Sequence, residues 1–205
     1  NKNVLGNIMQ SFICIALVSL DWILWGYSMA FGHDHWGTAG ALTWTLLECK
    51  QQGKTTSLGA ASGAIAGLAT VTPAAGFVGP LSAAVIGILA GTGCYYGIMI
   101  KSRFGYDDSL DVVGIHGVGG AIGLIATGLF ASKAVNPGGA NGLFFGNPSQ
   151  VWIQCVAVLV TIVYAFSLSY LFLKLVDKLI GLRISEQDEI AGLDLSQHDE
   201  TAYTF

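Results

Sequence analysis

Charged side chains are scarce in this sequence. Asp, Glu, Lys and Arg make up only 11% of the 205 residues, whereas about a quarter is usual for a soluble domain. Hydrophobic residues make up 53%, so the chain has too few polar groups to cover a soluble domain of this size. A membrane-spanning helix needs about 20 mostly apolar residues, and about six such segments fit here. The composition therefore predicts an all-α membrane protein, a polytopic bundle of about six transmembrane helices.

An excess of positive charge is also missing, because the formal net charge is -4. Surfaces that bind nucleic-acid phosphates are basic, so the sequence predicts no nucleic-acid partner. The four cysteines lack the spacing of metal ligands, and the pair His33 and His35 supplies too few ligands for a metal site. The apolar segments also lack a Ser/His or Asp/Asp pair of the catalytic kind. We therefore expect no metal, no cofactor and no enzyme activity.

Long apolar runs are what the chain does contain, and glycine is frequent, at 28 residues. Glycine lets membrane helices approach closely. The second apolar run is short for a crossing and the sixth is long enough to tilt or to extend past the bilayer. Asp21 in the first run and the missing charged leader argue against a cleaved signal peptide. The six expected spans are residues 7–31, 36–49, 57–77, 80–100, 110–131 and 149–180.

The positive charges predict the orientation of these spans. Short cytoplasmic loops carry an excess of Lys and Arg. With six crossings and the N-terminus of this chain inside, only Lys133 falls outside. The cytoplasmic cations are then Lys2, Lys50, Lys54, Lys101, Arg103, Lys174, Lys178 and Arg183.

Residues 181–205 differ from the rest because they are acidic and polar. We expect a membrane domain over residues 1–180 and a cytosolic tail over residues 181–205. The tail is either a solvated, partly disordered end or a regulatory segment that docks on the basic inner loops.

His116 is the most informative residue. An ionisable side chain at membrane depth is costly and marks a pathway or a proton relay by default. The alternative is a neutral histidine that is hydrogen-bonded between helices. On α-helical spacing Gly120, Gly123 and Thr127 share its face, so a neighbouring helix or a narrow pore is expected to lie close to the ring.

Three carboxylates precede His116, at Asp107, Asp108 and Asp111. They cap the N-terminus of its helix or form a cytosolic vestibule that attracts cations.

Glycine ridges at four-residue spacing predict close helix packing. The expected packing glycines are Gly59, Gly63, Gly67, Gly119, Gly120 and Gly123.

Four segments carry a resemblance to a known family. They are DDSLDVVGIHGVGG at residues 107–120, SLGAASGAIAGLATVTPAAGFV from Ser57, WGYSMAFG from Trp25, and GLRISEQDEIAGLDLSQH from Gly181. Together they resemble the ammonium transporter family, the Amt/Mep/Rh group, over nearly the whole chain. The resemblance implies a trimer of eleven-span protomers, each with a pore lined by two touching histidines and an outer site of aromatics and a serine.

By order and motif the six spans resemble the second and the seventh to eleventh of that family. The other spans are missing, with a discontinuity near residues 34–40. His116 then corresponds to the second pore histidine. The resemblance implies a multi-pass protein of the plasma membrane that moves ammonium through a hydrophobic pore after deprotonation, with ammonium or ammonia and the lipid bilayer as partners. It implies a homotrimer or an assembly with full-length family members. A truncated, non-conducting subunit or regulatory fragment is the alternative.

Overall fold

The computed structural model describes residues 37–200, which are helical and contain no strand. The expected first span, residues 7–31, lies outside this range. The described residues belong to two compact units, residues 37–162 and residues 163–200. The elements are α3 (Gly37–Gln52), α4 (Ser57–Val71), the 3-10 turn η2 (Thr72–Ala74), α5 (Pro80–Phe104), the π-helix η3 (Val113–Gly117), α6 (Val118–Phe130), the 3-10 turn η4 (Leu143–Phe145), α7 (Ser149–Ile180), α8 (Glu186–Ala191) and α9 (Leu193–Ser196).

Local sequence signals explain where these helices begin and end. The Thr56 side chain accepts a hydrogen bond from the Gly59 amide at 2.9 Å and caps α4, because the first amides of a helix have no partner in the helix itself. Pro73 lies in η2, directly after α4. Helix α5 begins with Pro80 and ends at Gly105, whose φ is 67°, a left-handed conformation that glycine adopts without strain.

Three of the described helical segments are long and apolar enough to cross a membrane: Pro80–Phe104, Val113–Phe130 and Ser149–Ile180. Helices α3 and α4 occupy the positions of the expected second and third spans, but they have 16 and 15 residues. At 1.5 Å per residue they reach about 24 Å or less, short of the roughly 30 Å of a hydrocarbon core. The α4 helix is continued by η2 up to Ala74.

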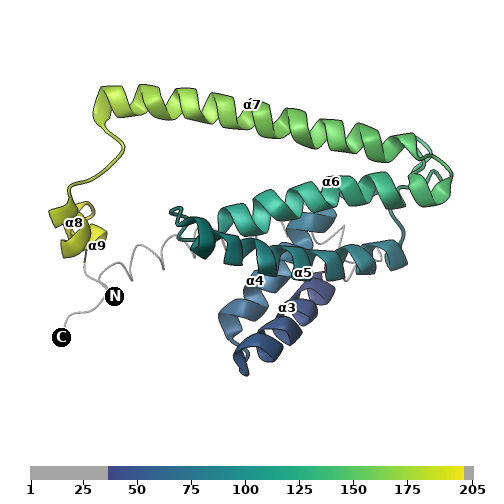
Figure 1. Cartoon of the computed structure of the whole chain (residues 1–205), viewed down its shortest axis with the longest axis horizontal. Coiled ribbons are helices and arrows are strands. Elements are labelled where there is room, and N and C mark those ends of the chain that lie inside the picture. The colour runs from purple at the N-terminus through teal and green to yellow at the C-terminus, as the bar shows by residue number, and fades with distance from the viewer. Residues whose placement is uncertain (1–36, 201–205) are drawn as a thin grey trace. The chain divides into compact units, whose positions relative to one another are not determined.

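Helices α3 to α6 pack into one bundle (Figure 1). Helix α3 lies against α4 and α5, and both α4 and α5 also contact α6. One hydrophobic cluster joins Trp44, Ala66, Cys94, Tyr95 and Ile115, and the rings of Trp44 and Tyr95 meet edge to face at 5.3 Å. A second cluster lies further toward the loop after α4 and consists of Ala74, Val78, Ala83, Ile86 and Ala126.

The glycine ridge of α4 is a contact surface for α3. A Cβ on Gly63 would lie 2.5 Å from the Cβ of Trp44, and a Cβ on Gly40 would lie 2.8 Å from the Cα of Gly67. A Cβ on Gly59 would collide with the carboxylate of Glu48. Since such distances leave no room for a side chain, the two backbones approach as closely as they do only because these positions are glycine.

The loop between α6 and α7 is built from ordered turns, as its Asn, Pro and Gly residues predict. The Ser132 amide donates to the Phe77 carbonyl at 2.8 Å, and the Gly142 amide donates to the Ala131 carbonyl at 2.7 Å. The Asn141 side chain accepts from the Lys133 amide at 2.8 Å. The first two bonds tie the loop to the segment between η2 and α5 and to the end of α6.

In the second unit the acidic tail forms two short helices, α8 and α9. The Ser185 side chain caps α8 by accepting from the Asp188 amide at 3.1 Å. Arg183 and Glu189 form an ion pair at 3.9 Å with both side chains more than half exposed, so this pair contributes little to stability. Within the tail, Glu186–Ala191 and Leu193–Ser196 are thus helical.

Candidate functional site around His116

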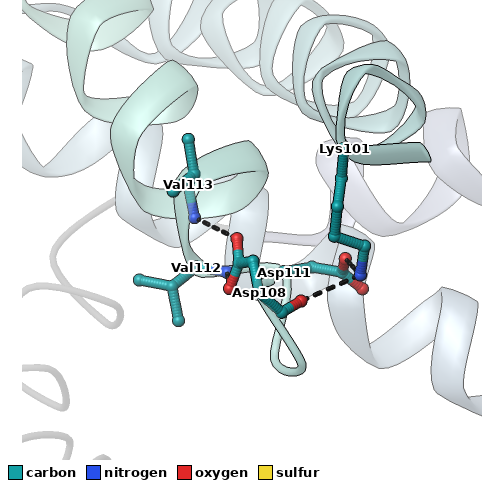
Figure 2. Close-up of polar contacts among 5 residues, drawn as sticks. All are labelled: Lys101, Asp108, Asp111, Val112 and Val113. Atoms are coloured by element: carbon teal, nitrogen blue, oxygen red, sulfur yellow. Dashed lines mark hydrogen bonds and ion pairs between the residues drawn. The ribbon is translucent and has the colours of Figure 1, made fainter. Parts of the chain in front are cut away.

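The turn that leads into the His116 helix is capped by Asp108. Its carboxylate accepts hydrogen bonds from the amides of Val112, at 2.9 Å, and Val113, at 2.8 Å (Figure 2). These amides begin the helix, where unpaired N–H groups and the helix dipole both favour a negative charge. Of the two roles expected for this carboxylate, the geometry is that of a helix cap.

Asp111 connects the same turn to α5. It forms an ion pair with Lys101, and the Lys101 ammonium also donates to the Asp108 carbonyl at 2.9 Å (Figure 2). Asp111 has a φ of 56°, which is uncommon for a residue other than glycine but is adopted more readily by Asp than by most residues. About a quarter to a third of each side chain is exposed, so solvent weakens the pair and its contribution is about 1 kcal/mol or less.

Asp107 and Asp108 also line an open hollow of 310 Å³ beside Lys101. This is where a cation vestibule would lie. The Lys101 ammonium offsets part of the negative charge there, so the local field is weaker than three carboxylates alone would produce.

His116 lies inside the π-helix Val113–Gly117, and its side chain is exposed. The expectation that it shares a face with Gly123 and Thr127 is wrong, because both of those residues are buried in the bundle. A π turn holds about one residue more than an α turn. The residues before and after it are therefore out of α-helical register, which rotates His116 away from the buried face.

The buried face of this helix is held by glycines. A Cβ on Gly119 would lie 2.7 Å from the Thr70 hydroxyl, and a Cβ on Gly123 would collide with the Thr70 carbonyl. A Cβ on Gly114 would lie 2.8 Å from the Ile98 amide of α5. The helix consequently sits directly on the backbones of α4 and α5.

Gly120 does not belong to this seam, contrary to expectation. No heavy atom of the described residues lies within 4 Å of the position of its Cβ. Gly120 lies three residues after the π-helix, and its Cβ would point to open space. His116 and the Cβ position of Gly120 are thus both left uncovered by residues 37–200.

Sequence reasoning missed the structural role of Glu48. Only 6% of this residue is exposed, and its carboxylate accepts from the Thr56 amide at 3.0 Å and from the Thr56 hydroxyl at 2.9 Å. It joins the end of α3 to the N-terminus of α4, where negative charge is favoured. The available signal was an acidic residue at the edge of an apolar run, eight residues before the helix cap.

Comparison with known proteins gives a consistent result. Residues 36–203 match the model of the Ammonium Transporter Family. The ammonium transporter of Bacillus subtilis (strain 168) is 43% identical over 209 residues, which cover 96% of this chain and 52% of that protein. The ammonium transporter Amt1 of Archaeoglobus fulgidus is 50% identical over 153 residues, covering 75% of this chain and 39% of that protein.

A solved structure shows the same fold. The crystal structure of Saccharomyces cerevisiae Mep2 is similar with a TM-score of 0.70 and 36% identity, over 74% of this chain and 35% of that chain. This chain spans about half the length of the curated relatives it matches, or less. The relatives carry the names of transporters rather than enzymes. The chain belongs to the ammonium transporter family.

Proposed function

We propose that this chain forms the His116-bearing part of a pore that moves ammonium across a membrane as ammonia. Membership in the family and the names of the relatives support ammonium as the substrate. The observation that carries the proposal is the position of His116. His116 is left exposed by the described residues and the Cβ position of Gly120 is open, while glycines of the same helix are packed against α4 and α5.

The physical basis is the cost of bringing an ion into a dry pore. An ammonium ion loses its hydration there at a cost of many kcal/mol unless it finds a compensating charge. Ammonia, the neutral form, avoids this cost. A histidine offers a hydrogen-bond donor or acceptor along an apolar path and can take part in proton transfer. Potassium has no proton to release, so a pore of this kind excludes it by chemistry rather than by size.

A selective pore needs a closed wall of helices. We propose that the uncovered face at His116 and Gly120 is closed by the spans that the relatives have and this chain lacks, and that a second imidazole reaches His116 from one of them. The match to the family model begins at residue 36, next to the discontinuity expected at residues 34–40.

The assembly is a homotrimer or a complex with full-length family members in the plasma membrane. The N-terminus of the chain and residues 181–205 lie in the cytosol, which is the arrangement favoured by the positive charges.

A chimera tests the role of His116. The part of the Bacillus subtilis relative that matches residues 37–200 is replaced by those residues, and uptake of labelled methylammonium is measured in cells without their own transporters. The variants are His116→Ala and, as the matched control, His198→Ala in the tail. We expect uptake by the chimera and by the control, and a loss of selective uptake with His116→Ala. Normal, potassium-insensitive uptake by His116→Ala would refute the pore role.

The second candidate function is a non-conducting subunit or regulatory fragment. It is favoured by one observation, that residues 37–200 leave His116 and the Cβ position of Gly120 uncovered. Expression of the 205-residue chain together with a full-length relative separates the two functions. A fragment that assembles will co-purify with the relative and change its uptake, although it carries none alone.

A further inference from the structure

One face of α5 holds the segment that leads to His116. Cys94, Gly97 and Lys101 follow each other at spacings of three and four residues, so they lie on one side of this helix. Lys101 binds Asp111 and the Asp108 carbonyl (Figure 2). At Gly97 the backbones meet, because a Cβ there would lie 3.1 Å from the Gly114 carbonyl oxygen.

The third contact point is a hydrogen bond from Cys94. Its thiol donates to the carbonyl of Ile115, with the sulfur 3.5 Å from the oxygen. Cys94 is completely buried, at 0% exposure. The Ile115 carbonyl belongs to the peptide group whose nitrogen is that of His116, and it also accepts from the Val118 amide. Fixing this carbonyl therefore fixes the peptide plane from which the His116 side chain departs.

The same sulfur lies close to Gly119 in α6, two residues after the π-helix. A Cβ on Gly119 would lie 3.1 Å from the Cys94 sulfur and 2.7 Å from the Thr70 hydroxyl oxygen. Thr70 is fully buried, at 0% exposure. The thiol thus lies between Ile115 and Gly119, and a π turn is a local departure from α-helical geometry that needs such support.

We propose that Cys94 is a positioning residue for His116. Its hydrogen bond to the Ile115 carbonyl keeps the turn at Val113–Gly117 in one register and so directs the imidazole to the uncovered face. Only the importance of Cys94 for transport rests on the proposed function. Its effect on the position of the His116 side chain does not. The sequence alone marks Cys94 as a packing residue, and a packing residue would not hold the carbonyl next to His116.

Infrared spectroscopy tests the hydrogen bond. The S–H band of Cys94 is identified in the 205-residue chain, reconstituted in lipid nanodiscs, as the band that is lost in Cys94→Ser. We expect it at a lower frequency than the band of a simple thiol in an apolar solvent. A band at the frequency of the unbonded thiol would overturn the proposal.

Magnetic resonance of the imidazole tests the positioning. The chain is labelled at its histidines, and the His116 signals are identified by their loss in His116→Gln. We expect one set of signals for the wild type, for Cys94→Ser and for the control Cys155→Ala in α7. With Cys94→Ala we expect a second set of signals to appear, because the loss of one weak hydrogen bond changes the ratio of the two ring orientations roughly fivefold.

Unchanged His116 signals in Cys94→Ala would overturn the proposal, and so would an equal change in Cys155→Ala. If Cys94→Ala does not fold, the proposal is tested by the S–H band of the wild type and by the His116 signals of Cys94→Ser. An unbonded S–H frequency would then overturn it, and so would a second set of signals in Cys94→Ser. These readouts do not depend on transport. Failure of the proposed pore function would instead appear as normal uptake by the His116→Ala chimera.

Discussion

Two glycines of α6 are predicted to respond in opposite directions to the same substitution. Gly123→Ala places a methyl group against the Thr70 carbonyl oxygen, closer than a carbon and an oxygen can approach, with the Pro73 side chain at 3.1 Å. Because the Thr70 contact is backbone, no side chain can rotate away, and α6 must move from α4. Gly120→Ala places the same group where no described atom lies within 4 Å.

The expected magnitudes follow from two effects. Replacing glycine by alanine within a helix stabilises it by about 0.5 to 1 kcal/mol. Inserting a methyl group into a closely packed contact costs about 1 to 3 kcal/mol. We therefore expect Gly123→Ala to lower the free energy of unfolding by about 1 to 2 kcal/mol and Gly120→Ala to raise it by up to about 1 kcal/mol.

The assay is unfolding of the 205-residue chain in mixed micelles with increasing sodium dodecyl sulfate, followed by far-ultraviolet circular dichroism. The wild type and the two variants are compared under identical lipid and detergent conditions. A Gly123→Ala chain as stable as the wild type would refute the close contact of α6 with α4. Equal destabilisation by both substitutions would refute the assignment of Gly120 to the open face.

Three further outcomes are expected. In a chain without its natural cysteines, single cysteines at positions 54 and 103 will not react with an impermeant reagent applied outside intact cells; reaction would contradict the predicted orientation. The 205-residue chain expressed alone will not take up labelled methylammonium above the empty vector, because a pore needs a closed wall of helices and residues 37–200 leave His116 exposed; uptake that is lost in His116→Ala would show that several copies assemble a pore. Asp108→Asn will lower the free energy of unfolding by about 1 kcal/mol through a weaker cap in the same detergent titration, whereas Glu186→Gln in the exposed tail will not.

The class of the protein and many helix boundaries could be predicted from the sequence. A chain with 11% charged residues and long apolar runs is stable in a lipid bilayer. Helices form there because they make their backbone hydrogen bonds within one segment. The beginnings of α4 and α5 follow from Thr56 and Pro80, because each acts on its neighbours along the chain. The expected spans ended at residues 77 and 100, whereas the helices end at Val71 and Phe104. The cap at Asp108 is equally local. These features need no knowledge of what packs against them.

The orientation of His116 was decided only by the tertiary structure. Counting at 3.6 residues per turn places it with Gly123, but the π turn at Val113–Gly117 breaks that register. The turn lies against α5, where Cys94 and Gly97 meet it, and these partners are about 20 residues away in the sequence. No periodicity within one helix contains that information.

The same reason separates the glycines that pack from the one that does not. Gly120 and Gly123 look alike in the sequence, yet Thr70 lies against only one of them. In the sequence Glu48 is only the polar end of an apolar run. The structure shows that its carboxylate accepts hydrogen bonds from Thr56. The sequence determined which segments are helices and that they belong in a membrane, because those properties depend on composition and near neighbours. Which side of each helix is closed and which is open depends on contacts between segments far apart in the chain, and only the fold supplies them.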